Sequence, residues 1–567
     1  MKTIWGENLN ETAILTEYPR PQMKRDSYLN LNGIWNYAIT ETENPPDCFD
    51  GEILVPFSPE SELSGVMRSL LPTQTLWYQR TLDIPPHFIT DRVLLHFGAV
   101  DQVATVYING TEVCTHVGGY TPFSTDITEN LLEQNTIIVK ARDFGDTSYH
   151  SRGKQKSKRG GIWYTAQSGI WQTVWIESVP DKYIKALRIT PMFDESAVEL
   201  TVLSESQNLC FANVGESESS FPANTPTKMY IQSFIPWTPE HPHLYDLTIS
   251  MGEDRVTSYF GMRKFSVEGD SNGVKRLFLN NRPYFHNGLL DQGYYCDGMY
   301  TAPSDEAMIF DIQTAKDMGF NMLRKHIKIE PLRWYYHCDR IGILVWQDMV
   351  NGGGDYRFST VSSPLITGIH FKDHRYRRFA RDNSEGRKQY YTELDEMISH
   401  LYNAVAIAMW VPFNEGWGQF DTIEAVRHIL KSDTTRTIDH ASGWHDQFIG
   451  DIKSLHVYFR KYRFEQDKLG RAVVLSEFGG YNFRVNGHCF NEKDFGYKRF
   501  QTKEVFLEAY RKLYLNEIIP AKSKGLCAAV YTQLTDVEDE LNGLVTYDRK
   551  VIKLPVEEVS LINGTVI

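Results

Sequence analysis

Hydrophobic and polar residues alternate along much of the first 180 residues, a pattern typical of half-buried β-strands. The run that ends at Ile108 enters Asn109-Gly110, a two-residue hairpin signal, and resumes at Thr111. No long segment with the 3.6-residue period of a helix interrupts these runs. The pattern therefore predicts a β-sandwich over residues 1–180. The clearest strand candidates are residues 92–98, 104–108, 135–141 and 172–177.

A second set of short alternating runs covers residues 181–275. Leucine, isoleucine and valine occupy every second position over 187–189 and 198–202, as side chains that face one core would. The number and spacing of the runs suggest an immunoglobulin-like sandwich. The polar stretch at 269–273 predicts a turn or linker after it.

From residue 276 to residue 567, strand-like runs alternate with helical ones. Capping residues predict one helix between Ser304 and Gly319 and another between Pro331 and Gly342. Eight strand candidates in this segment fit a (β/α)₈ TIM barrel, whose active site lies at the carboxyl ends of the strands. The candidates are residues 284–288, 321–326, 343–348, 405–411, 437–440, 454–458, 472–476 and 528–533.

Charge and aromatic content narrow the partners of this chain of 567 residues. The net charge is −13, and an acidic chain repels phosphate backbones, so we expect no nucleic-acid partner. Aromatic residues make up 13% of the chain and can form stacking platforms for sugars. The densest basic run, residues 154–159, is flanked by glycines and is interpreted as a solvated loop, with a role at the rim of a site left open.

The seven cysteines are scattered without a C-x-x-C pair, so neither a zinc ribbon nor a disulfide framework is expected. The N-terminus has no apolar signal segment, and the most apolar run, residues 404–413, is too short to span a bilayer. We therefore expect a cytoplasmic protein without a membrane partner. We expect neither a metal nor a cofactor, and a homo-oligomer is compatible with the sequence.

Polar groups end several of the barrel strand candidates, so they should converge on one mouth. Glu415 and Glu477 follow the fourth and seventh candidates, and a facing pair of carboxylates suits glycoside hydrolysis. The alternative is that each glutamate caps a helix or pairs with an arginine. The other strand-end groups are Asp291, Gln292, Arg324, His326, Gln347, Asp348, Asn414, His456, Tyr458, Gln533 and Asp536.

Competing motifs lack the context that their chemistry needs. The G-x-S-x-G match at 269–273 lies in a polar linker, not between a buried strand and a helix. His241-Pro-His243 lies outside the barrel segment, and Gly352-Gly-Gly354 is too short to cradle a phosphate. His326 and His456 are interpreted as hydrogen-bonding groups, not as metal ligands.

Several segments, in the same order, resemble glycoside hydrolase family 2, which includes β-galactosidases, β-glucuronidases and β-mannosidases. Trp410–Gly418 (WVPFNEGWG) resembles the Asn-Glu acid/base signature, and Leu475–Gly480 (LSEFGG) resembles the nucleophile strand. Ser168–Trp175 resembles the end of the N-terminal sugar-binding sandwich. Asn321–Arg324 and Cys338–Gly342 resemble the second barrel strand and the following helix.

The resemblance implies a jelly-roll sandwich, an immunoglobulin-like domain and a catalytic barrel, with a retaining exo-acting mechanism. It assigns Glu477 as nucleophile and Glu415 as general acid and then base. Asn414 would bind the sugar 2-hydroxyl, Arg324 would keep Glu477 ionised, and Tyr458 would support Glu477. Further sugar-site residues are expected to be His326, Asp348, Trp417, Trp444, His456 and Gln533.

The sugar is less defined than the mechanism. Galactose is the first expectation from family frequency, and mannose or an arabinose-type sugar remains open, because residues 345–348 are closer to the β-mannosidase pattern. The Asn-x-Lys with which β-glucuronidases bind a carboxylate is absent from residues 536–550, which argues against a uronic acid. A carbohydrate-binding protein without activity is the non-enzymatic alternative, although both glutamates are present.

Overall fold

The computed structural model describes residues 1–566, and its N-terminal part is a sandwich of two antiparallel sheets that share one apolar core. Asn109 and Gly110 both have positive φ, 52° and 82°, as the predicted two-residue hairpin turn requires. One sheet has the order β1 (Tyr28–Asn30), β14 (Val174–Val179), β5 (Arg92–Phe97), β9 (Phe123–Asp126). The other has the order β3 (Gly51–Val55), β2 (Gly33–Thr40), β4 (Thr75–Thr81), β10 (Thr136–Arg142), β7 (Val103–Ile108), β8 (Thr111–Val117).

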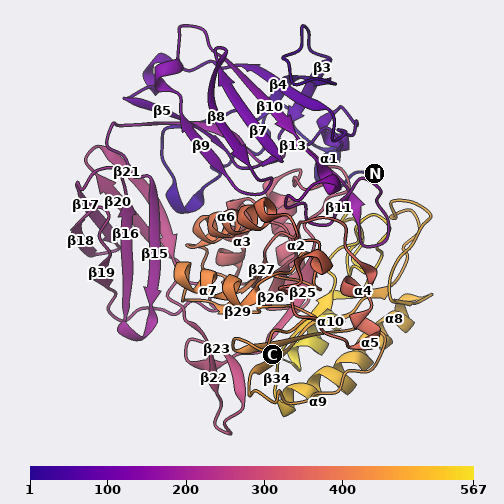
Figure 1. Cartoon of the computed structure of the whole chain (residues 1–567). Coiled ribbons are helices and arrows are strands. Elements are labelled where there is room, and N and C mark those ends of the chain that lie inside the picture. The colour runs from indigo at the N-terminus through magenta and orange to yellow at the C-terminus, as the bar shows by residue number, and fades with distance from the viewer. Residues whose placement is uncertain (567) are drawn as a thin grey trace.

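A second sandwich of three and four strands follows and packs against the side of the barrel (Figure 1). Alternate apolar residues of its strands point into one core, as their spacing predicted. Its sheets have the orders β15 (Ala186–Met192), β16 (Ala197–Leu203), β19 (Thr227–Tyr230), and β18 (Ser217–Pro222), β17 (Leu209–Val214), β20 (Tyr245–Met251), β21 (Asp254–Phe260).

A hairpin leads from this sandwich into the barrel. It pairs β22 (Phe265–Gly269) with β23 (Lys275–Leu279), and β23 also pairs with β24 (Arg282–Pro283). The predicted turn closes it, where Gly273 N–H donates to the carbonyl of Asp270 over 2.8 Å. The hairpin therefore spans the boundary that the sequence placed at residue 275.

Eight parallel strands form the C-terminal barrel, so the fold class expected from the sequence is confirmed. The last strand returns to pair with the first. Within residues 1–566, the fifth and sixth strands are the only neighbours that do not pair with each other. In chain order the strands are β25 (His286–Asp291), β26 (Met322–Lys325), β27 (Leu344–Asp348), β28 (Ile407–Val411), β29 (Thr437–Ile438), β30 (Ile452–Val457), β31 (Ala472–Gly479) and β34 (Leu526–Thr532).

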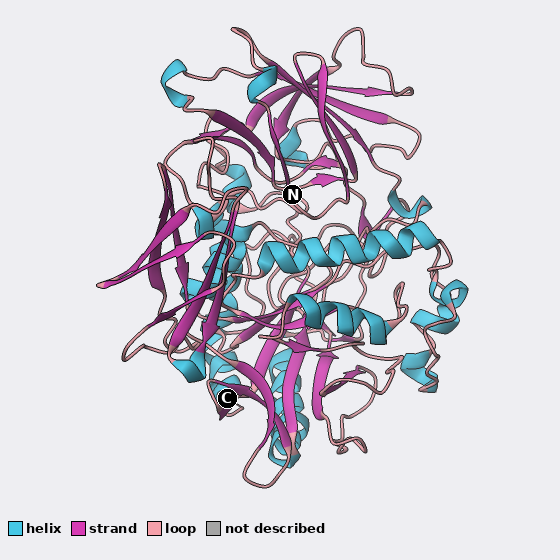
Figure 2. Cartoon of the chain, turned by 60° about the vertical axis from the view of Figure 1, so that its left-hand side comes forward, coloured by secondary structure: helices cyan, strands magenta, loops and turns pink. Residues whose placement is uncertain are grey.

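Helices surround this barrel, and in the turned view they separate it from the two strand-rich sandwiches (Figure 2). The Ser304 hydroxyl caps the first long helix, and Gly342 ends the next at φ 84°, as their positions predicted. Within residues 1–566, none of the helices has the length and apolar character needed to span a membrane. The main helices are α2 (Asp305–Asp317), α3 (Leu332–Ile341), α6 (Ser384–Leu401), α7 (Thr422–Ser432), α8 (Lys503–Leu513), α9 (Ile519–Lys524) and α10 (Val556–Gly564).

A buried ion cluster joins the two sandwiches. Arg25 donates to Glu177 of β14 over 2.8 Å and to both carboxylate oxygens of Asp254 of β21 over 2.9 and 2.8 Å. Burial alone would raise the pKa of Glu177, but the charges of Arg20 and Arg25 hold that pKa well below its usual range. The guanidinium of Arg25 therefore neutralises buried carboxylates from two domains.

We expect Arg25→Ala to lower the free energy of unfolding by about 3–5 kcal/mol, because it leaves the buried Asp254 without its counter-ion and Glu177 with Arg20 alone. Urea unfolding followed by tryptophan fluorescence measures the change. Arg92→Ala is the matched control, since its ion pairs with Asp126 and Asp181 are exposed and should contribute at most about 1 kcal/mol. Equal losses in the two variants would contradict the account of this cluster.

Candidate active site

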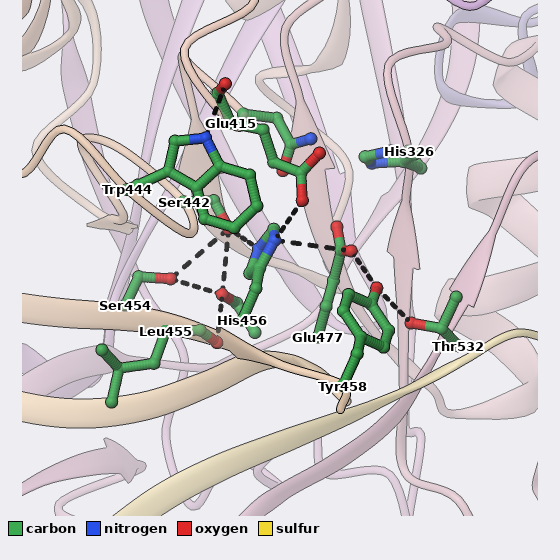
Figure 3. Close-up of polar contacts among 12 residues, drawn as sticks. His326, Glu415, Ser442, Trp444, Ser454, Leu455, His456, Tyr458, Glu477 and Thr532 are labelled. Atoms are coloured by element: carbon green, nitrogen blue, oxygen red, sulfur yellow. Dashed lines mark hydrogen bonds and ion pairs between the residues drawn. The ribbon is translucent and has the colours of Figure 1, made fainter. Parts of the chain in front are cut away.

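Two glutamates from different barrel strands face each other at the barrel mouth (Figure 3). Glu477 lies within β31, whereas Glu415 follows β28 on a loop and has a φ of 51°, a left-handed backbone that is uncommon for a side chain of this size. Glu415 N–H donates to the carbonyl of Ser442 over 2.9 Å, and Ser442 N–H donates to Phe413 over 2.9 Å. These bonds hold the strained loop against the segment that follows β29.

His456 of β30 lies between the two carboxylates. Its Nδ1 is 2.8 Å from Glu415 Oε1 and 3.5 Å from Glu477 Oε2. One oxygen of each glutamate and one nitrogen of this ring all lie within 4.8 Å of one another. On the other side of the ring, Nε2 is 3.0 Å from Ser442 Oγ. One oxygen of each carboxylate thus lies within 4.8 Å of the other, which is the close spacing of a retaining pair rather than the wider spacing of an inverting one.

The same three side chains form the one group of histidine, cysteine and acidic residues in residues 1–566 that could share a metal ion. All three side chains already have hydrogen bonds, His456 with Glu415 and Glu477 with the Tyr458 hydroxyl. The arrangement therefore supports acid–base chemistry by the carboxylates themselves.

Arg324 of β26 is the hub of the mouth and is fully buried. It binds Asp348 through two parallel hydrogen bonds of 3.0 Å and donates to Glu477 Oε1 over 3.2 Å. Its Nη2 also donates to Asn414 Oδ1 over 2.8 Å. The other contact of Asp348 is a hydrogen bond with His326, whose Nδ1 is 2.6 Å from Asp348 Oδ2. One guanidinium thereby orients groups from four different strands or strand ends.

The two carboxyl groups differ in acidity. Burial raises the pKa of Glu415, and the nearby charge of Glu477 raises it further, against the hydrogen bond from His456. Burial would also raise the pKa of Glu477, but the charges of His456 and Arg324 outweigh burial and lower it. The Tyr458 hydroxyl adds a hydrogen bond to the charged form of Glu477. Glu415 is therefore the weaker acid of the pair, and Glu477 is the stronger one.

At the carboxyl ends of the barrel strands, the side-chain amides of Asn414 and Gln533 have donors without a partner among the described residues. Asn414 Nδ2 and Gln533 Nε2 are buried and unpaired, although Arg324 and Gln292 bind the oxygens of the same amides over 2.8 and 2.7 Å. A buried donor without an acceptor is costly, so these amides are suited to a polar ligand such as a sugar hydroxyl.

The structure brings together most of the residues that the sequence placed at the site. Trp444 Nε1 donates to the Glu415 carbonyl over 2.9 Å and lies on the opposite side of the carboxylates from His326 (Figure 3). The ring of Trp417 is 6.1 Å from that of His326. Gln533 is the outlier, because it bonds Gln292 and reaches the pair only through its neighbour Thr532, whose hydroxyl is 3.0 Å from Tyr458.

A loop of the N-terminal sandwich also reaches the barrel mouth, which the sequence did not predict. The interpretation of residues 154–159 as a solvated loop is wrong for its first two residues, because Lys154 is 5% and Gln155 is 2% exposed. Trp163 of this loop packs on Trp417 with ring centroids 5.2 Å apart. Only the basic run and its flanking glycines marked the segment, and burial against the barrel has no local signal in the sequence.

Three family models match the chain in order. They are described as the sugar binding domain of glycosyl hydrolases family 2 for residues 66–180, glycosyl hydrolases family 2 for residues 193–263, and the TIM barrel domain of that family for residues 275–551.

Relatives and solved structures agree with these models. A putative β-glucuronidase of Formosa agariphila is 27% identical over 52% of this chain and 37% of its own length. A β-galactosidase of Thermoanaerobacter pseudethanolicus is 25% identical over 64% of this chain, again less than half, 47%, of its own length. The solved β-D-glucuronidase of Dictyoglomus thermophilum has the same fold, with a TM-score of 0.74 at 17% identity over 96% of this chain and 98% of that one. Because models of one family cover most of the chain in the expected order, the chain belongs to glycoside hydrolase family 2.

Proposed function

We propose that this chain is a retaining, exo-acting β-glycosidase that uses Glu477 as nucleophile and Glu415 as general acid and base. The observation that carries the proposal is the pair of facing carboxyl groups with opposite pKa shifts and oxygens within 4.8 Å. Retaining enzymes have carboxyl groups roughly 5–5.5 Å apart, whereas inverting enzymes leave roughly 6.5–9.5 Å for a water. The spacing supports a covalent intermediate.

In the first step, a Glu477 oxygen bonds to the anomeric carbon while Glu415 gives its proton to the leaving oxygen, whose bond to that carbon breaks. Arg324 and Tyr458 hold Glu477 in its ionised form and in one orientation. Burial keeps Glu415 protonated until the leaving group needs the proton. The product of this step is a glycosyl ester of Glu477.

In the second step, Glu415 is a carboxylate and takes a proton from water as the water oxygen attacks the anomeric carbon and releases Glu477. The unpaired Nδ2 of Asn414 can bind the sugar 2-hydroxyl, a contact that strengthens in the transition state. Because the anomeric carbon is attacked twice, the released sugar has the configuration of the substrate.

An exo mode is supported by the way in which the sandwich loop closes one side of the mouth. Arg152 N–H donates to the Asn351 carbonyl over 2.9 Å, and Ser151 forms a bridge with Gly352 in the loop after β27. Trp163 covers Trp417 behind them. A mouth closed on this side by the sandwich loop is compatible with a terminal sugar as the unit that binds.

Two terminal sugars are the leading candidates. A β-galactoside is the first expectation from the sequence, and relatives named β-galactosidase match the chain. A β-glucuronide is the second, because relatives of this name match the chain and a lysine of the sandwich loop, Lys154, is buried near the carboxylates.

We expect Glu477→Gln to lower kcat by several orders of magnitude on every glycoside that the wild type hydrolyses, because an amide cannot form the glycosyl ester. Stopped assays with aryl β-glycosides measure this, with circular dichroism to verify folding. Glu60→Gln, the same change at a sandwich carboxylate bonded to Ser168, is the matched control and should leave kcat unchanged. Near-normal turnover by Glu477→Gln would refute its role.

We expect Glu415→Ala to lose most of its kcat/KM on substrates with poor leaving groups and little on activated aryl glycosides, which depart without a proton. Turnover of the activated substrates should still fall, because the second step has lost its base. Because the acid must be protonated, the wild-type kcat/KM should fall as pH rises through the raised pKa of Glu415, and the variant should lose this alkaline limb. Azide should restore turnover and give a β-glycosyl azide. An unchanged alkaline limb and an equal loss on good and poor leaving groups would rule out Glu415 as acid/base.

A further inference from the structure

Lys154 is a buried cation at the barrel mouth that belongs to the N-terminal sandwich. Its side chain is held among aromatic rings, with Nζ 5.5 Å from the ring centroid of Tyr164 and 5.7 Å from that of Trp417. The backbone is fixed as well, because Tyr164 N–H donates to the Lys154 carbonyl over 3.0 Å. The residue before it, Gly153, has a φ of 63°, and a Cβ there would lie 2.8 Å from the Tyr300 hydroxyl. The lysine is thus placed by a tightly packed loop.

This lysine has no counter-ion among residues 1–566, where no carboxylate lies within 4.0 Å of its Nζ and no acceptor binds it. The other buried lysines of the barrel each have a carboxylate partner. Lys325 binds Asp291 and Glu330 over 2.6 and 2.8 Å. Lys553 binds Asp536 over 2.7 Å. Lys154 is 5% exposed as a residue and its ammonium has no anion, so an anionic ligand would complete the site around it.

The position of Lys154 relative to the catalytic pair defines where that ligand would bind. Burial is the main cause of the raised pKa of Glu415 and of the lowered pKa of His326, and the charge of Lys154 lowers both values. Lys154 therefore lies close to the two groups, on the side of the mouth formed by His326 and Trp417. Trp444 and His456 lie on the other side (Figure 3). A sugar bound at Glu477 would occupy the space between these two sides.

We propose that Lys154 binds an anionic substituent of the terminal sugar, so that the enzyme prefers acidic glycosides over neutral ones. The proposal rests on the β-glycosidase activity proposed above and names its substrate class. The chemistry is that of a carboxylate or a sulfate ester, whose oxygens accept charge-assisted hydrogen bonds from an ammonium. The absence of Asn-x-Lys from residues 536–550 argued for a neutral sugar. The cation comes here from the N-terminal sandwich, whose loop packs against those residues through Arg159 and Asp539, 2.8 Å apart.

The test compares kcat/KM for 4-nitrophenyl β-D-galactopyranoside, β-D-glucuronide, β-D-galacturonide and a 6-O-sulfated β-galactoside. Lys154→Met removes the charge and keeps an unbranched apolar chain against Trp417 and Tyr164. We expect it to lower the ratio of kcat/KM for the best anionic substrate over that for the neutral galactoside by about 10–100-fold. Preference among the uronides and the sulfated sugar distinguishes a carboxylate from a sulfate.

Lys156→Met is the matched control, because Lys156 lies on the same loop and packs on Trp163 with Nζ 4.9 Å from the ring. It should leave the selectivity ratio unchanged. A measurement on the wild type avoids any folding defect of the variants: free D-glucuronate or D-galacturonate should inhibit at least 10-fold more tightly than D-glucose or D-galactose. Lys154→Met should also unfold at a temperature no lower than the wild type, since it removes an unpaired buried charge.

The outcomes separate this inference from the proposed function. Hydrolysis of the neutral galactoside with no preference for anionic sugars, or an equal loss on both classes in Lys154→Met, would overturn the inference and leave the glycosidase intact. If no aryl glycoside is hydrolysed by the wild type, the proposed function itself fails.

Discussion

The arrangement of the active site depends on one buried guanidinium. Arg324 is fully buried, and every donor direction that it offers toward the mouth is used, on Asp348, Glu477 and Asn414. Because a planar guanidinium binds in fixed directions, it sets the relative orientation of groups that come from separate strands. Its charge also supplies part of the field that keeps Glu477 ionised. Geometry and protonation state thus have a common origin in this residue.

The difference in acidity between the two glutamates follows from their surroundings, not from their chemistry. Hydrogen-bond donors and positive charge around Glu477 lower its pKa, whereas burial and the charge of Glu477 raise the pKa of Glu415. Two carboxylates this close cannot both be charged at low cost, so one is kept protonated. The left-handed backbone of Glu415, fixed by Ser442, is part of the same arrangement because it aims the side chain at its partner.

Much of the fold could be predicted from the sequence because its signals are local. The hairpin at Asn109-Gly110 and the caps at Ser304 and Gly342 act within a few residues, and the periodicity marks the barrel strands. Contacts between distant segments gave no such signal. The loop with Lys154 is buried through contacts with residues about 200 positions away, such as that of Arg152 with Gly353, and a basic run between glycines looks solvated without them.

The central claim is that Glu415 and Glu477 act through a covalent glycosyl-enzyme. Proton NMR of the first sugar released from an aryl β-glycoside tests it most directly, provided that spectra are recorded before mutarotation mixes the anomers. The approach of the two carboxylates, with one oxygen of each within 4.8 Å of the other, predicts that the β-anomer appears first. Initial release of the α-anomer would contradict the account, even if both glutamates proved essential.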